Sequence, residues 1–319
     1  MELIDKLIFL RNSLKSSVYF WKLLQHPRFV NERYIGEIVR CTHSLEKGLS
    51  LEHVRSGFGY SKIKNACSII KKYKNNNGDM QAEPLIMFID ALESYINYHH
   101  NIQYKNDTIE EIENLYVSLI KDIKTINHQY GGVKKIERKN YTREDQDLLA
   151  RLFKNRHSMR EFSKKPIDKE DLRKSIEMAM QCPSACNRQC YRLHIVDKKS
   201  FSLLNNGFEG VGGFADDLEK IMFITGKVSV YRPGEIHQWV VTSTVFASYL
   251  TLSLEAHNIG CCFIQRPVDY NKQWMDISKS IGAAEDEQLV CCLGIGKLKD
   301  SYTVPVSHRF DYDTIVSEI

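Results

Sequence analysis

A long apolar segment in the last third of the chain restricts the folds open to it. Residues 236–257 carry valine, alanine and leucine at nearly every helical angle, interspersed mainly with serine and threonine. A helix on the surface of a globular protein is apolar along one stripe, whereas one that is apolar nearly all round has to be buried. We therefore expect this segment to form a helix at the centre of a fold or of a dimer, with Gly260 as its left-handed C-terminal cap.

Three short apolar runs accompany this central helix and predict buried strands. They lie at residues 193–196, 221–225 and 289–295. Each is bounded by polar or turn-forming residues, which is typical of a strand inside a sheet. Amphipathic helices are predicted at 148–153 and after Asp168, which can cap the helix that follows it. Since the predicted strand content is small, the fold class is α+β.

The first part of the chain has a different pattern. Residues 1 to 130 show helical periodicity and no convincing strand, and one of the helices begins with a capping box formed by Thr108 and Glu111. Residues 131–143 are polar, basic and without periodicity, which indicates a linker. The length of 319 residues has room for two domains. We predict a helical domain at 1–143 and a second domain at 144–319.

Charge and cysteine usage exclude several classes of protein. The formal charge of +4 arises from 44 basic and 40 acidic residues without long runs of one sign, so neither nucleic acid nor a membrane is expected as a partner. The apolar run at residues 7–10 is too short for a signal peptide or a membrane span, and a cytoplasmic location is expected. Nine cysteines are then interpreted as reduced thiols. Three of them recur every fourth residue from Cys182, but without a Cys-x-x-Cys pair zinc is disfavoured.

A basic cluster follows the predicted helix at 148–153. Arg156 and Arg160 place two guanidiniums four residues apart, with the hydroxyl of Ser158 between them and the imidazole of His157 beside it. These donors suit a phosphate, which accepts forked hydrogen bonds from arginine. A single cluster of this kind is more often a solvated charged surface than a binding site. Two further elements follow it in order.

The first of these is a Pro-Ser turn with two side-chain amides, and the second is a basic group near the C-terminus. The turn contains Pro183, Ser184, Asn187 and Gln189, and the late basic group is His308 and Arg309. In this order the motifs Arg-x-Ser-x-Arg, Pro-Ser-x-x-Asn-x-Gln, a buried helix ending in Gly and a late Arg resemble the nitroreductase family of FMN-dependent oxidoreductases. The resemblance covers roughly residues 145–319. It implies a nitroreductase-like three-layer fold with a small mixed or antiparallel sheet, preceded here by an all-helical N-terminal region.

The resemblance also implies roles for individual residues. Arg156, Ser158 and Arg160 would hold the phosphate and ribityl chain of FMN, beside His157. Arg309 and His308 would close on the phosphate, since Ser307 stands where many relatives carry Lys. A backbone N–H near Ile264 or Gln265 would point at the flavin nitrogen that receives hydride.

The turn has an implied role of its own. Pro183, Ser184, Asn187 and Gln189 would border the isoalloxazine ring. In the family such turn residues commonly come from the opposite subunit, so a homodimer with flavin at its interface is expected.

Two functions follow from this reading. The first is an NAD(P)H-dependent flavoenzyme that passes hydride through FMN to an electron-poor small molecule of nitro, quinone or enone type. The second is a flavin-binding module whose helical half recruits a protein partner. The flavin carries the chemistry, so no catalytic side chain is predicted. Residues 43–59 are read either as a helix ended by Gly48 with a loop after it, or as a lid that carries His43 and Arg55 over the flavin.

Overall fold

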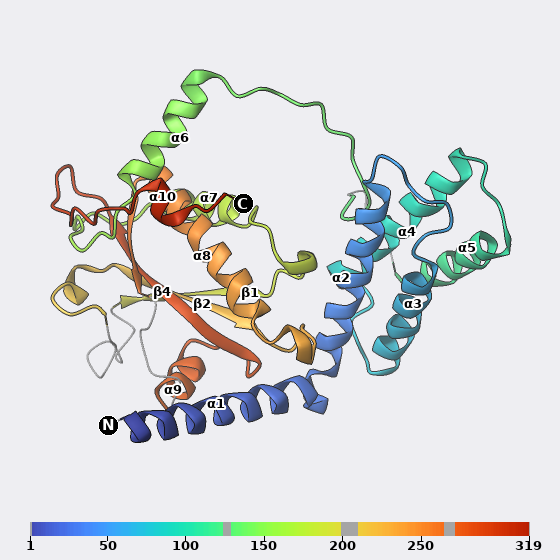
Figure 1. Ribbon diagram of the computed structural model, residues 1–319, viewed down its shortest axis with the longest axis horizontal. Coiled ribbons are helices and arrows are strands. Elements are labelled where there is room, and N and C mark those ends of the chain that lie inside the picture. The colour runs from blue at the N-terminus through green and yellow to red at the C-terminus, as the bar shows by residue number, and fades with distance from the viewer. Residues whose placement is uncertain (1, 124–128, 199–209, 265–271, 319) are drawn as a thin grey trace.

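The computed structural model describes residues 2–123, 129–198, 210–264 and 272–318 (Figure 1). The helices are α1 (Glu2–Gln25), α2 (Val30–Leu49), α3 (Tyr60–Asn75), α4 (Glu83–Asn101), α5 (Asp107–Leu119), α6 (Arg143–Asn155), α7 (Lys169–Ala179), α8 (Gln238–Ala256), α9 (Lys272–Ser280) and α10 (Tyr312–Ile315). The strands are β1 (Tyr191–Asp197), β2 (Lys220–Lys227), β3 (Ile259–Ile264) and β4 (Glu287–Lys297). None of the described helices combines the length and the apolar character that a membrane crossing requires.

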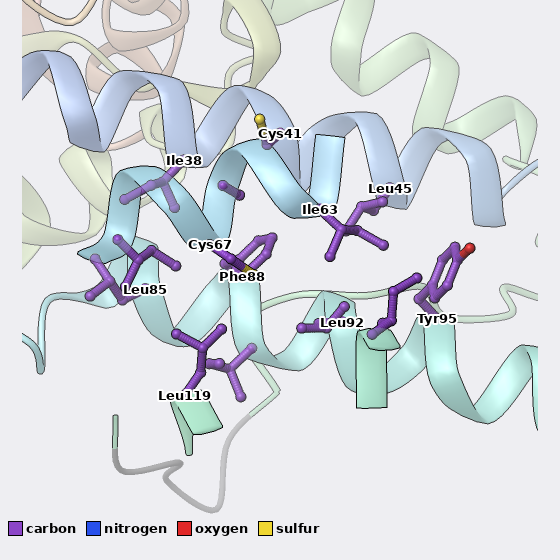
Figure 2. Packing of buried hydrophobic residues seen from close by; sticks show 14 of the residues in the cluster. Ile38, Cys41, Leu45, Ile63, Cys67, Leu85, Phe88, Leu92, Tyr95 and Leu119 are labelled. Atoms are coloured by element: carbon purple, nitrogen blue, oxygen red, sulfur yellow. The ribbon is translucent and has the colours of Figure 1, made fainter. Parts of the chain in front are cut away.

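Helices α2 to α5 form a bundle with its own core, which Figure 2 shows from close by. Ile38, Cys41 and Leu45 lie three or four residues apart on α2, so they share one face of that helix. This face packs on Phe88 and Leu92 of α4, and all five side chains are buried. The prediction of an all-helical N-terminal region is confirmed for the described residues.

The C-terminal half has three layers around one antiparallel sheet with strand order β1-β2-β4-β3. Successive side chains of a strand point to opposite faces. On β2, Met222 therefore packs on the α7–α8 side with Phe246, whereas Phe223 packs on the other side with Trp274 of α9. Figure 1 shows α8 lying across one face of this sheet and α9 on the other. The α+β class, the three-layer arrangement and the antiparallel alternative are confirmed.

The three strands predicted from apolar runs are β1, β2 and β4, and the central helix is α8. Two predicted helix ends were wrong. The residue that turns the chain after α8 is Asn258, which has a φ of 57°, while Gly260 lies inside β3. A Cβ on Gly260 would lie 2.8 Å from the side chain of Leu298, so glycine is needed there for close packing rather than for a left-handed turn. Helix α5 is capped not by Thr108 but by Asn106, whose Oδ1 accepts the N–H of Ile109 at 3.0 Å.

Helix α2 joins the bundle to the sheet unit, as Figure 1 shows. Its first turn carries Glu32, which forms an ion pair with Lys227 at the end of β2 over 2.7 Å. One turn later Gly36 meets the backbone of Val230 so closely that a Cβ would lie 2.9 Å from the Val230 carbonyl carbon. This face of α2 therefore lies directly against the segment that follows β2.

Candidate functional site

The basic cluster lies on an extended segment that crosses the end of the sheet. Helix α6 ends at Asn155, and the φ and ψ of Arg156, −65° and 114°, turn the chain into an extended path. Ser158 forms a parallel bridge with Cys261 of β3, and the Met159 N–H donates to the Cys261 carbonyl at 2.9 Å. The Ser163 N–H then donates to the Lys297 carbonyl of β4 at 2.8 Å. Backbone hydrogen bonds at both ends thus fix the segment 156–163.

The side chains of this segment differ in burial. Met159 and Phe162 are buried, and Phe162 lies over Gly296, where a Cβ would be only 2.6 Å from its ring. In an extended chain every second side chain points to the same side. Within residues 156–160, Arg156, Ser158 and Arg160 therefore alternate with the buried Met159, with Arg160 exposed and the other two half-buried. This alternation ends before Phe162, which stands two residues after Arg160 and is buried. The Arg-x-Ser-x-Arg pattern presents two guanidiniums and a hydroxyl together.

The electrostatics of the cluster favour an anion. Within the described residues neither Arg156 nor Arg160 forms an ion pair with a carboxylate, and Arg160 donates only to the Ser158 carbonyl, at 3.3 Å. His157 directs Nδ1 at the Asn155 carbonyl at 2.6 Å. The nearest acidic influence is Glu255 in the last turn of α8. Burial raises the pKa of Glu255, while the charges of His157 and Arg156 oppose that rise. No local pattern marks Glu255, because it is one charge at the end of an apolar helix.

The predicted Pro-Ser turn is a short helical turn, η2 (Ala185–Asn187), with unusual backbone angles. Cys186, Asn187 and Gln189 have φ values of 52°, 56° and 43°. The Gln189 N–H donates to the Ser184 hydroxyl at 3.2 Å, and the Gln189 side-chain amide donates to Asn187 Oδ1, also at 3.2 Å. Pro183, Asn187 and Gln189 are exposed and Ser184 is half-buried. The turn thus presents amides on a constrained backbone.

A buried arginine holds this turn in place. The side chain of Arg188 is 1% exposed and forms two hydrogen bonds with Glu235, at 2.9 and 2.6 Å. Its guanidinium also lies 4.2 Å from the ring centroid of Tyr231 and donates to the Val230 carbonyl at 3.3 Å. No local sequence pattern marks Arg188 as a positioning residue, because its partners follow more than 40 residues later in the chain.

The two parts of the predicted site lie at different places along α8. The Ala185 N–H in the turn donates to the Thr242 hydroxyl in the first half of the helix, at 3.4 Å. The Arg156 segment instead lies near Glu255, in the last turn. At about 1.5 Å of rise per residue, these two helix positions are about 20 Å apart. A single chain therefore does not bring the turn and the arginines together.

The remaining predicted residues are placed as follows. Ile264 is buried at the end of β3, opposite Cys292 of β4. Gln265 lies outside the described residues. His308 and Arg309 are exposed, and Arg309 donates to the carbonyl of Ser307. No described hydrogen bond or ion pair connects these two to the segment 156–163.

The predicted lid consists of two parts. His43 lies within α2, which continues through Gly48 to Leu49, whereas Arg55 is exposed in the loop at 50–59. This loop is fastened to α4, because the Gly57 N–H donates to Nε2 of His99 at 2.9 Å and the Tyr95 hydroxyl donates to the Phe58 carbonyl at 2.7 Å. A role of either part over a flavin stays a prediction.

Comparisons with known proteins converge on the C-terminal half. The model of the nitroreductase family matches residues 153–239. A curated Streptococcus pyogenes protein that carries an NAD(P)H nitroreductase name is 42% identical over 52 residues, which are 16% of this chain and about a quarter (26%) of the relative's length. An FMN-dependent nitroreductase from Clostridium difficile is 21% identical, with a TM-score of 0.44 over 53% of this chain and 98% of that one. A nitroreductase with bound FMN from Desulfitobacterium hafniense is 18% identical, with a TM-score of 0.42 over 53% and 97%.

The matched stretch at 153–239 contains both the arginine segment and the Pro-Ser turn. The first two motifs that indicated the resemblance thus lie inside the matched stretch, whereas Arg309 lies outside it. Residues 153–239 of this chain are therefore similar to the nitroreductase family.

Proposed function

We propose that this protein is an FMN-dependent oxidoreductase that passes hydride from NAD(P)H through bound FMN to an electron-poor small molecule. The observation that carries the proposal is the placement of Arg156, Ser158 and Arg160 at every second position, none of them buried, on an extended segment fixed to β3 and β4. The match of the nitroreductase family model to residues 153–239, which include these three, supports it.

The donor set fits the phosphate of FMN. A phosphate monoester carries close to two negative charges and accepts forked hydrogen bonds from arginine. Arg156 and Arg160 have no carboxylate partner within the described residues, so their donors remain available. Each charge-assisted bond contributes about 1.5 to 3 kcal/mol. When bound, FMN supplies the hydride-transfer chemistry, and these residues bind and orient it.

We further propose that the active form is a homodimer. Apolar side chains on α8, on α6 and in the C-terminal tail are left uncovered by their own chain: Tyr249 is 44% exposed, Phe153 59% and Phe310 75%. Contiguous exposed apolar surface usually marks an interface. A twofold copy packed along α8 would set the turn of one subunit beside the arginine segment of the other. This arrangement would join the halves that lie about 20 Å apart in one chain.

The first test is the visible spectrum of the purified protein, followed by titration with FMN. We expect stoichiometric binding in a dimer, and Arg156→Gln should weaken FMN binding by roughly 10- to 100-fold through the loss of charge-assisted bonds. Lys154→Gln is the matched control, since Lys154 is an exposed cation at the end of the same helix. A folded protein that takes up no FMN would refute the proposal.

Anaerobic addition of NADH or NADPH distinguishes the enzyme from the alternative, a flavin-binding module whose helical half recruits a protein. The enzyme should be bleached within seconds and recover its colour when an acceptor is added. Flavin that stays oxidised under both nicotinamides would favour the binding module.

A further inference from the structure

We infer that helix α2 forms one wall of the acceptor site and selects acceptors that carry a carboxylate. The residues concerned are Arg40, His43 and Lys47, which we call the α2 basic stripe. This inference rests on the proposed function, because it requires the flavin ring to lie at the Pro-Ser turn. It adds a substrate class that the resemblance alone does not provide.

The first step is the contact between α2 and the turn. Gly36 of α2 lies against the carbonyl group of Val230, and the same carbonyl accepts a hydrogen bond from Arg188 of the turn at 3.3 Å. Arg188 is the residue that directly follows η2. Helix α2 is therefore the part of the helical bundle that reaches the turn, and it does so on the face that contains Gly36.

The second step is helical periodicity. Positions 36, 40, 43 and 47 are separated by four, three and four residues, so they form one stripe along α2. The buried stripe of Ile38, Cys41, Leu45 and Leu49 lies on the opposite face and packs in the bundle. The α2 basic stripe thus continues the face of Gly36 from the point of contact with the sheet unit. Gly36 and Lys47 are about 16 Å apart along the axis, which is long enough to border a bound ring and its substrate.

The third step is charge. Arg40 and Arg232 both donate to the carboxylate of Glu37, so two cations share one anion and a net positive charge remains. His43 is half-buried and Lys47 is exposed, and neither has a hydrogen-bond or ion-pair partner in the described part of the chain. The nearby Glu46 is engaged elsewhere, because its carboxylate accepts the Gly132 N–H at 3.2 Å.

These features together give the α2 basic stripe a net positive charge. The cations Arg40 and Lys47, with the imidazole of His43 between them, offer a substrate carboxylate hydrogen bonds that are stronger than those to a neutral analogue. A contact of this kind is worth roughly tenfold in affinity or more. The stripe lies outside the arginine segment, so it acts on the acceptor and not on the FMN phosphate.

The test compares two acceptors of the same shape, 4-nitrobenzoate and 4-nitrobenzamide, on the FMN-loaded dimer. We expect the wild type to favour the carboxylate in kcat/KM. Lys47→Gln and His43→Gln should each reduce this preference about tenfold, because they should raise KM for 4-nitrobenzoate much more than KM for 4-nitrobenzamide, with kcat little changed. Lys71→Gln, which replaces an exposed lysine on α3, is the control and should leave kcat/KM for both acceptors unchanged.

A second readout does not depend on turnover. Binding of benzoate and benzamide to the oxidised protein is followed by the change in flavin absorbance, and Lys47→Gln should weaken benzoate alone. If both stripe variants treat charged and neutral ligands as the wild type does, while FMN binding and reduction of 4-nitrobenzamide persist, the α2 wall is wrong and the proposed function stands. A protein that binds no FMN overturns both proposals.

Discussion

Replacing Gly36 by alanine tests whether the bundle and the sheet unit are locked together through α2. Alanine is the better helix former by about 1 kcal/mol, so helix propensity alone predicts a more stable protein. The structure predicts the opposite. A Cβ at position 36 would lie 2.9 Å from the Val230 carbonyl carbon and 3.0 Å from its Cα, where ordinary contacts begin at 3.4 Å.

The obstacle is backbone rather than a side chain that can rotate away. Helix α2 would have to retreat by roughly 1 Å, and forcing an extra methyl into a packed interface costs about 1 to 3 kcal/mol. We use a cost of about 3 kcal/mol because the Val230 backbone cannot rotate away as a side chain could. Subtracting the gain of about 1 kcal/mol in helix propensity leaves a net loss of stability of about 2 kcal/mol. The same retreat would lengthen the ion pair between Glu32 and Lys227.

The assay is thermal unfolding of Gly36→Ala beside Gly212→Ala. Gly212 is exposed and an added Cβ would meet nothing within 4 Å, so its substitution should be neutral. At an unfolding entropy of about 2.1 cal/mol/K per residue, a loss of about 2 kcal/mol corresponds to a fall in Tm of about 3 °C for 319 residues. A Gly36→Ala protein as stable as the wild type, or more so, would refute the close contact of α2 with Val230.

Two further perturbations follow from buried polar groups. Burial lowers the pKa of His99 below its ordinary value of 6.5, and its neutral Nε2 accepts the Gly57 N–H. The stabilisation of the fold by neutral His99 should be complete above pH 6.5 and should decline as the pH falls from 6.5 through the lowered pKa. The Tm of the wild type should therefore drop between about pH 7 and pH 5 more than the Tm of His99→Gln. Glu235→Gln leaves the guanidinium of Arg188 buried without its anion and should cost about 3 to 5 kcal/mol in urea unfolding, and a loss below about 1 kcal/mol would contradict the assignment.

The elements that could be predicted from the sequence are those whose signal is local. Helix α8 and strands β1, β2 and β4 were visible because buried elements are apolar over most of their length. Strand β3 was missed, since it begins directly after the turn at Asn258 and contains Gly260, which resembled a helix cap. The reason for that glycine is packing against Leu298 and Phe162, which no local pattern reveals.

The candidate site, too, has features that the local sequence shows and features that depend on contacts between distant residues. The spacing of Arg156, Ser158 and Arg160 was readable, because alternation in an extended chain is a local property. The bridge that holds this segment to Cys261 was not, and neither was the pairing of Arg188 with Glu235, because each joins distant parts of the chain. Local patterns therefore indicated the candidate binding groups, while the residues that position them required the tertiary structure.

The attachment of the arginine segment to β3 also bears on solubility. Strand β3 is an edge of the sheet, and an uncovered edge strand offers its free N–H and carbonyl groups to a strand from another molecule, which is a route to aggregation. The Ser158–Cys261 bridge and the hydrogen bond from the Met159 N–H occupy part of that edge. The segment that holds the guanidiniums outward thus also protects the sheet from pairing with a neighbouring chain.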